Sequence, residues 1–323
     1  MQTRRTMRVL ITGAAGFIGH GVACRLLDEG DEVVGLDNLT PYYDPALKRA
    51  RLRELEGRPG FVFRVGDLAD FETIERLLDG VDVVVHLAAQ PGVRHALRDP
   101  FTYERTNVGG MLHVLEAVRR RSPPPRLVWA SSSSVYGGNR RVPFAETDRV
   151  DDPVSLYAAT KRAGELIAHS YRHLFGLPAV GLRFFTVYGP WGRPDMAYWK
   201  FAEALLDDRP IEVFGSTAAS RDMTYIDDVV DGVVAAVHRP VTDELLNLGD
   251  ATPVTLERLI ATVEHAVGRT ARRIALPAQP GDVETTFADI ARSGEVLGYA
   301  PKVRLDEGIL RFVEWLKKWR GEK

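Results

Sequence analysis

RVLITGAAGFIG, residues 8–19, is the stretch that decides the fold of this chain. A short apolar run typical of a strand leads into Gly13, Gly16 and Gly19, and a segment with helical spacing follows. Glycines let a turn pass close to a diphosphate, and the N-terminus of a helix adds N–H groups and a positive dipole end. The spacing is G-x-x-G-x-x-G, between a strand and a helix, which is the context that a dinucleotide-binding turn requires. The stretch therefore predicts a nucleotide site at the start of a β-α unit.

The first half of the chain alternates between strand-like and helix-like segments. Apolar, β-branched runs occur at residues 8–11, 32–36, 61–65, 82–86, 126–130 and 179–185. Segments with helical spacing lie between them, at residues 17–29, 71–78, 102–120 and 155–175. This alternation predicts an α/β fold, a Rossmann-like doubly wound parallel sheet with helices on both faces. The near-continuous apolar runs are those expected of buried parallel strands.

After residue 185 the pattern loosens into shorter helices and strands, and residues 305–319 have the spacing of an amphipathic helix. We interpret residues 1–185 as the nucleotide-binding domain and residues 186–323 as a smaller, mixed α/β lobe that binds the substrate. No flexible Gly/Ser linker separates the two parts, so we expect their segments to interleave.

The composition is that of an ordinary globular enzyme. The chain has 323 residues, which suggests roughly two domains. Hydrophobic residues make up 45% and charged residues 27%, which excludes disordered, collagen-like and small disulfide-stapled proteins. Lys and Arg number 42 against 44 Asp and Glu, a net charge of −2. No basic excess therefore points to nucleic acid or an anionic membrane.

Cys24 is the single cysteine, so an internal disulfide is impossible and an oxidising compartment gains no support. The N-terminus lacks the apolar core of a signal peptide, and no run of about 18 apolar residues occurs, so a cytoplasmic protein without a membrane partner is the expectation. His20 and Cys24 have the i,i+4 spacing of two metal ligands, but zinc takes at least three protein ligands. We therefore expect no metal site.

Asp37 ends the second predicted strand, 18 residues after Gly19. A carboxylate there accepts hydrogen bonds from the adenosine ribose hydroxyls and repels a 2′-phosphate, which favours NAD over NADP. Further candidates follow the third and fourth strands, because the carboxyl ends of parallel strands share the edge at which ligands bind. The predicted cofactor-binding residues are Gly13, Gly16, Phe17, Ile18, Gly19, Asp37, Asn38, Asp67, Leu68, Leu87, Ala88, Ala89, Gln90 and Asn107.

Tyr157 and Lys161 form a Tyr-x-x-x-Lys motif, which places both side chains on one face of a helix. A free tyrosine ionises at about pH 10, so its phenolate is about 4 kcal/mol out of reach at neutral pH. A lysine ammonium and a cationic nicotinamide ring both lower that cost. A run of four serines, residues 131–134, ends the fifth predicted strand and offers a hydroxyl that can share the substrate's proton.

These motifs together resemble the extended short-chain dehydrogenase/reductase family, in particular its nucleotide-sugar epimerases and dehydratases. The resemblance covers nearly the whole chain, and its most specific stretches are HLAAQPGVR (86–94), ASSSSVYG (130–137), SLYAATK (155–161), LRFFTVYGPWGRPDMA (182–197) and RDMTYIDD (221–228). The chain departs from the family at His20, which is often serine, and at Met223, which is usually phenylalanine.

The resemblance implies a catalytic set of Ser132, Tyr157 and Lys161, of which the last two also contact the cofactor. Within the family, the chain is most similar to enzymes that convert UDP-glucuronate to UDP-galacturonate. In that reaction Tyr157 takes the proton of the carbon-4 hydroxyl while hydride passes to NAD. The 4-keto sugar turns over, and hydride returns to its other face with no net redox change. The resemblance also implies a homodimer built on the helices at 102–120 and 155–175.

The resemblance places a UDP-sugar in the second lobe, where a uronate sets a particular problem. Once carbon 4 is a ketone, the sugar carboxylate is β to it and can leave as carbon dioxide. We hypothesise that hydroxyls and an arginine hold the carboxylate out of alignment with the ketone. The residues of this set are Ser133, Ser134, Thr186 and Arg193. The other predicted substrate contacts are Arg94 and Arg221 for the diphosphate, Lys200 and Val213 for uridine, and Asp282 for the ribose. Asp282 alternatively only caps a turn.

Other functions compete with this interpretation. A dehydratase of the family uses an Asp-Glu pair just after the catalytic hydroxyl, and a decarboxylase typically has glutamate immediately before V-Y-G. This chain has Ser133 and Ser134 there, which disfavours both reactions. An epimerase of a neutral UDP-hexose would give Arg193 no partner. A non-enzymatic protein with the same fold need not keep Tyr-x-x-x-Lys together with the upstream hydroxyl.

Overall fold

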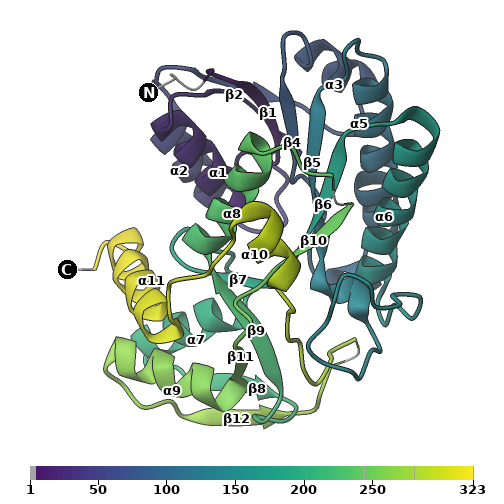
Figure 1. The fold of residues 1–323 in the computed structure, drawn as a ribbon. Coiled ribbons are helices and arrows are strands. Elements are labelled where there is room, and N and C mark those ends of the chain that lie inside the picture. Colours follow the sequence, from purple (N-terminus) through teal and green to yellow (C-terminus); the bar gives the residue numbers. More distant parts are fainter. Residues whose placement is uncertain (1–4, 243, 280, 323) are drawn as a thin grey trace.

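A parallel sheet of seven strands forms the centre of the computed structural model, which describes residues 5–242, 244–279 and 281–322 (Figure 1). Every neighbouring pair of strands in it is parallel. This arrangement confirms the predicted Rossmann-like doubly wound sheet. In sheet order the strands are β10 (Leu245–Leu248), β6 (Ala179–Phe184), β5 (Arg126–Ser132), β4 (Val83–His86), β1 (Arg8–Thr12), β2 (Glu32–Asp37) and β3 (Phe61–Val65).

Helices cover both faces of this sheet (Figure 1). One face carries α3 (Phe71–Leu77), α5 (Gly110–Arg119) and α6 (Leu156–Phe175), and the other carries α1 (Phe17–Asp28), α2 (Pro45–Leu55) and α8 (Ile226–His238). The alternation of side chains along each strand explains the two layers. Val9 and Ile11 of β1 belong to the core that contains Val22 of α1, whereas Leu10 belongs to the core that contains Val114 of α5. Full burial of one such side chain stabilises the fold by about 1.5–3 kcal/mol, so apolar packing holds both layers.

The chain after β6 also builds a smaller, mixed α/β lobe. Its strands are β7 (Thr186–Tyr188), β8 (Ile211–Phe214), β9 (Ser220–Tyr225), β11 (Pro253–Thr255) and β12 (Arg273–Leu276), and the further helices of this half are α7 (Ala197–Leu206), α9 (Leu256–Val267), α10 (Ala291–Leu297) and α11 (Leu305–Trp319). β9 pairs with β7 in parallel and with β11 in antiparallel orientation, and β8 pairs with β12 in parallel. The predicted mixed character of this lobe is confirmed.

Two segments of the C-terminal half return to the large sheet. β10 pairs with β6, with Leu245 opposite Gly181. α8 packs against α1, where a Cβ added to Gly21 would lie 2.9 Å from Cγ2 of Val230. The sheet that carries the N-terminal nucleotide turn is thus completed by distant sequence. The domain boundary at residue 185 stays a prediction.

Two helical segments differ from the sequence prediction. α2 lies outside the predicted helices, because its buried side includes Lys48 and Arg51 and its apolar periodicity is therefore obscured. The predicted helix at 102–120 is divided into α4 (Pro100–Tyr103), a π-type turn at Glu104–Gly109 and then α5. No helix in the described residues is both long and apolar enough to cross a membrane.

Candidate active site

The three glycines of the turn after β1 are packed too tightly to accept side chains. Gly13 has a φ of 77°, and a Cβ built on it would lie 2.8 Å from the Ala88 nitrogen. A Cβ on Gly19 would lie 2.1 Å from the Gly13 carbonyl oxygen. α1 begins after Gly16 without a side-chain cap, so no capping group competes for its first N–H groups. This backbone cradle fits the diphosphate of a dinucleotide.

Asp37 is buried at the end of β2, and its carboxylate is already hydrogen-bonded. Oδ2 accepts from the Ala15 N–H at 3.2 Å. Oδ1 accepts from the Leu39 N–H at 2.8 Å and from Lys48 Nζ at 3.3 Å. A carboxylate has about four acceptor positions, so Asp37 keeps capacity for a ribose hydroxyl. Lys48, which the motifs do not indicate, balances the buried charge.

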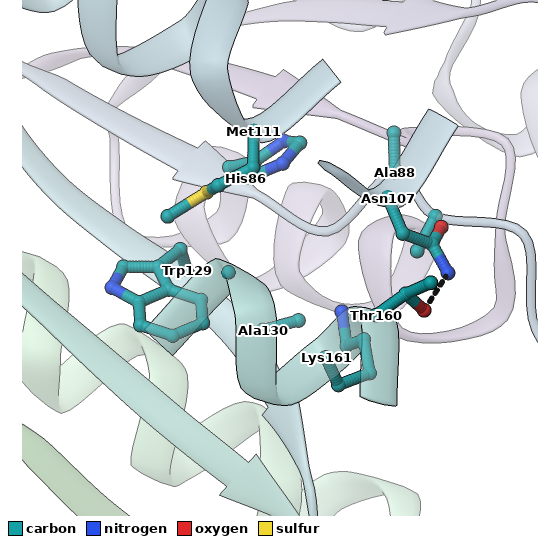
Figure 2. Close-up of a pocket in the computed structure, with 10 residues that line it drawn as sticks. His86, Ala88, Asn107, Met111, Trp129, Ala130, Thr160 and Lys161 are labelled. Carbon is teal, nitrogen blue, oxygen red and sulfur yellow. Dashed lines mark hydrogen bonds between the residues drawn. The ribbon is translucent and has the colours of Figure 1, made fainter. Parts of the chain in front are cut away.

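The other cofactor candidates lie along the same edge of the sheet. Asn38 Nδ2 donates to Asp67 Oδ2 at 2.9 Å, which links the ends of β2 and β3. Asn107 accepts from the Gln90 N–H at 2.8 Å and donates to the Gln90 carbonyl at 3.1 Å. It also donates to Thr160 Oγ1 at 3.1 Å (Figure 2). Both amide hydrogens of Asn107 are thus used within the protein, where they hold the loop after β4 against α6. The apolar candidates are Phe17 and Ile18 at the start of α1, Leu68 after β3, and Leu87, Ala88 and Ala89 after β4.

Lys161 and His86 line a small cavity between the sheet and α6 (Figure 2). Burial and the Lys161 charge lower the pKa of His86 to about 3, so its imidazole is neutral; it hydrogen-bonds to Thr12 Oγ1 at 2.8 Å. Burial lowers the pKa of Lys161 to about 8, and the Glu165 charge opposes this effect. Lys161 is therefore mostly charged at neutral pH, next to a histidine that is not.

α6 presents Tyr157 in its first turn. Ser155 caps the N-terminus of this helix, and its Oγ accepts from the Ala158 N–H at 3.1 Å. Burial raises the pKa of Tyr157, whereas a hydrogen bond with the Ser132 side chain and the Arg193 charge lower it. The structure thus brings the end of β5 to the phenol. Sequence reasoning attributes the lowering of this pKa to lysine, but the cation that acts on the phenol here is Arg193.

A buried ion pair that the motifs do not reveal holds α6 against the sheet. Arg183 donates to Glu165 from Nε at 2.8 Å and from Nη2 at 2.9 Å, and both side chains are 1% exposed. Ser131 Oγ also donates to this carboxylate, at 2.6 Å. Ser131 directly precedes Ser132, so the network fixes the strand end that carries the candidate hydroxyl. In the sequence, Glu165 is recognisable only as an acid four residues after Lys161. That spacing does not predict its ion pair with Arg183 of β6.

A second cavity, of about 120 Å³, lies beside the end of β5. Ser133, Ser134, Thr186, Arg221 and Asp282 are among its lining residues. Burial lowers the pKa of Arg221, and the Asp282 charge opposes this effect. A largely buried guanidinium at a cavity wall is compensated when an anion binds, as a diphosphate would.

The remaining substrate candidates are divided by the structure. Arg94 pairs with Asp282 at 3.5 Å and lies over the Phe214 ring, 5.3 Å from its centroid. Asp282, which lines the cavity, is therefore the ion-pair partner of Arg94. Lys200 is exposed on α7 and Val213 is buried in β8, and neither lines this cavity. The structure thus does not bring the two uridine candidates to the serines.

Arg193 already has a carboxylate partner. Its Nε donates to Asp195 Oδ1 at 3.0 Å and its Nη2 donates to Oδ2 at 2.6 Å. The Tyr42 hydroxyl donates to the same Oδ2 at 3.1 Å. Arg193 is not among the residues that line the cavity of about 120 Å³. Its two-pronged contact in this structure is therefore with Asp195 and not with the space that the serines face.

The loop after β7, residues 189–194, has the Gly-Pro-Trp-Gly composition of a mobile loop but is held from two sides. Arg51 of α2 is fully buried, and its Nε donates to the Trp191 carbonyl at 3.1 Å. Its Nη1 donates to the Ala15 carbonyl, in the glycine-rich turn, at 3.0 Å. On the other side, the Trp191 ring packs on Trp315 of α11, with centroids 5.1 Å apart. Arg51 thus joins the nucleotide turn to the loop that carries Arg193.

Comparison with known proteins identifies the family of this chain. Residues 9–249 match the model of the NAD dependent epimerase/dehydratase family. A probable UDP-glucuronate 4-epimerase of Rhizobium meliloti is 46% identical over 96% of both chains. The structure resembles UDP-glucuronic acid 4-epimerase from Bacillus cereus in complex with UDP-glucuronic acid and NAD, with a TM-score of 0.92 and 35% identity over 97% of this chain and 100% of that one. It also resembles a UDP-glucose 4-epimerase from Thermotoga maritima with UDP-glucose, with a TM-score of 0.88 and 30% identity over 97% of this chain and 100% of that one. The chain belongs to the NAD dependent epimerase/dehydratase family.

Proposed function

We propose that the protein catalyses the NAD-dependent epimerisation of UDP-glucuronate to UDP-galacturonate at carbon 4. The proposal is carried by the meeting of Tyr157, Ser132 and Lys161 at the carboxyl edge of the sheet, beside a cavity lined by hydroxyls and Arg221. Similarity to enzymes that bear this name, over nearly the whole chain, supports the same substrate.

The cradle after β1 and the acid at the end of β2 fit NAD. We assign the diphosphate to Gly13, Gly16 and Gly19, where a Cβ would collide with backbone. We assign the adenosine ribose to Asp37, whose charge disfavours a 2′-phosphate. When bound, NAD supplies a reversible hydride acceptor, so oxidation at carbon 4 and reduction of the resulting ketone cancel.

Tyr157 is the group that moves the proton of the carbon-4 hydroxyl in this proposal. Its phenol oxygen takes the proton, and the Ser132 hydroxyl shares it through their hydrogen bond. Lys161 lies one turn along α6, and we assign it a contact with the cofactor beside Tyr157. Arg193 adds a positive charge near the phenol.

The hydroxyl-rich cavity favours retention of the sugar carboxylate over its removal. Ser133, Ser134 and Thr186 can each donate a hydrogen bond to a carboxylate oxygen. Among the described residues that line this cavity, Asp282 supplies the carboxylate, and it is paired with Arg94. No unpaired acid of the kind that the resemblance requires for a dehydratase or a decarboxylase is therefore present among these described lining residues.

A neutral UDP-hexose is the second candidate substrate, and one observation favours it. Arg193 already pairs with Asp195, so a sugar without a carboxylate would not leave a bare guanidinium in the site. The likeness to the Thermotoga UDP-glucose 4-epimerase agrees with this alternative.

The deciding experiment is incubation of the protein with UDP-glucuronate and NAD, followed by proton NMR of the sugar. Appearance of UDP-galacturonate without net NADH is the expected result. UDP-pentose with carbon dioxide would identify a decarboxylase. Turnover of UDP-glucose but not of UDP-glucuronate would identify a neutral-sugar epimerase. A parallel incubation without added NAD shows whether the protein retains its cofactor.

We also propose that the enzyme is a cytoplasmic homodimer. Leu112 of α5 and Leu166 and Phe175 of α6 are 40%, 52% and 46% exposed. The two helices lie side by side on the same outer face of the sheet (Figure 1). Apolar side chains that gather on one face are typical of protein interfaces. The free thiol of Cys24 suits a reducing compartment.

A further inference from the structure

Asp195 accepts two hydrogen bonds from one edge of the Arg193 guanidinium. The two hydrogen bonds of this pair use Nε and Nη2, and Nη1 takes no part in them. The side chains of Arg193 and Asp195 are 24% and 29% exposed, so water screens the pair only in part. Burial would raise the pKa of Asp195, but the charge and hydrogen bonds of Arg193 hold it below its ordinary value. Asp195 is therefore an anion at neutral pH.

Tyr42 completes this arrangement from the loop after β2. Its hydroxyl donates to Asp195, and its ring lies under Arg193, with Cζ 5.9 Å from the ring centroid. Burial and the Asp195 charge raise the pKa of Tyr42 to about 12. Tyr42 thus remains a neutral donor across the working range of an enzyme and contributes no charge of its own.

Titratable groups reach Tyr157 from several elements. Lys161 follows it on α6. The loop after β7 reaches it through a row of packed rings, because Arg193 lies over the Tyr42 ring and that ring meets His95 edge-on, with centroids 5.1 Å apart. The Tyr103 ring of α4 meets its ring edge-on, with centroids 6.3 Å apart. His95 packs against Tyr103, with centroids 6.1 Å apart. Of these groups, Arg193 is the one with an anion bound to it in a bidentate pair.

We propose that Asp195 is a positioning residue for this reaction, which holds Arg193 and cancels part of its charge, and thereby sets how much positive potential the phenol of Tyr157 experiences. The inference rests on the proposed function, because it assigns Tyr157 the role of proton acceptor. The guanidinium retains Nη1 for a substrate group, so the pair and substrate binding are compatible.

The sign of the effect follows from the charges. Arg193 lowers the pKa of Tyr157, and an adjacent anion weakens that influence. Asp195→Asn keeps the shape of the side chain and removes the anion, so the phenol should ionise at lower pH. Arg193→Met removes the cation and leaves the anion, so the phenol should ionise at higher pH. The two substitutions therefore move the same pKa in opposite directions.

The test compares the pH profile of kcat/KM for the NAD-saturated enzyme and three variants, with UDP-glucuronate as substrate. In Asp195→Asn the acid limb should move down by about 0.5–1 pH unit, as expected of one charge at intermediate dielectric. Asp195→Glu restores the charge and should restore the wild-type limb. Tyr42→Phe removes the hydrogen bond to Asp195 but no charge, so its limb should also coincide with that of the wild type.

A second readout does not depend on turnover. The near-ultraviolet absorbance of the Tyr157 phenolate is titrated in the wild type, Asp195→Asn and Arg193→Met, and the spectrum of the matching Tyr157→Phe protein is subtracted. Opposite shifts in the two variants support the inference even where the wild type does not turn over UDP-glucuronate, which would count against the proposed function alone. A rate loss in Asp195→Asn without any shift overturns the inference. An equal shift in Asp195→Glu also overturns it.

Discussion

Lys161 carries its charge in surroundings that disfavour it. It is 9% exposed, and burial lowers its pKa from 10.5 to about 8 against the opposing charge of Glu165. The unfolded chain therefore binds more protons than the folded one between these two pH values, and stability rises with pH across that window. The cost of burying the ammonium is fully present below about pH 8 and is gone above about pH 10.5. A buried lysine of the candidate active site thus weakens the fold at neutral pH.

Lys161→Met should show this cost directly. At pH 7 the variant should be more stable than the wild type, by up to about 3 kcal/mol, and the gain should shrink as the pH rises above 8. Urea unfolding at several pH values measures it. Lys200→Met, on the exposed surface of α7, is the matched control and should show no pH-dependent difference. A gain for Lys161→Met that is the same at every pH would contradict the argument.

At this scale the sequence is informative where a motif is local. Tyr157 and Lys161 share one helix, so four residues of spacing suffice to place them together. The partner of Arg193 also follows two residues later, but nothing in the spacing indicates that Asp195 takes both donors. Tyr42 is 153 residues away from Asp195, and only the fold brings it there.

α2 acts as a brace between the nucleotide turn and the substrate loop. Arg51 donates to the carbonyls of Ala15, Trp191 and Gly192. The first lies in the glycine-rich turn after β1, and the other two lie in the loop after β7. Arg51→Met should leave these buried carbonyls unsatisfied and lower the free energy of unfolding by about 2–4 kcal/mol. It should also weaken NAD binding, because the turn that holds the diphosphate loses its support. Urea unfolding and calorimetric titration with NAD measure both effects.

Arg49→Met is the matched control, because Arg49 is exposed on the same helix. It removes the same charge and should leave both stability and NAD affinity near wild-type values. An Arg51→Met protein with wild-type NAD affinity would show that the brace does not reach the nucleotide turn.

Hydrophobic periodicity predicts the helices and strands that have an apolar face. It does not predict an element whose buried side also carries charged residues. The strands of the sheet are apolar runs, and their predicted bounds agree with β1 to β6 within two residues. α2 buries Lys48 and Arg51, so its sequence lacks the apolar stripe that identifies a helix. β10 is a four-residue strand whose place beside β6 depends on a long connection, which local sequence does not encode.

The outer face of α5 and α6 determines the oligomeric state in our proposal. Leu166 is 52% exposed on this face, and a twofold dimer would bury it twice. Leu166→Lys should therefore raise the dimer dissociation constant by about 100-fold or more, as sedimentation velocity measures. Leu310→Lys on α11, which is 47% exposed on a different helix, is the control and should leave the dimer intact. A wild-type protein that sediments as a monomer would refute the dimer itself.

The return of β10 to the large sheet sets the order in which the chain can mature on a ribosome. Leu245 pairs with Gly181, which left the ribosome 64 residues earlier. Until then, β6 is an edge strand with unpaired backbone groups. Its Gly181 leaves room for Leu245, because a Cβ there would lie 2.7 Å from Leu245 Cδ2. The nascent chain therefore passes through a stage in which the other six strands of the large sheet have been synthesised but β10 is still missing from its edge. A translational pause before residue 245 would prolong that stage, and there the chain is most exposed to mispairing with its neighbours.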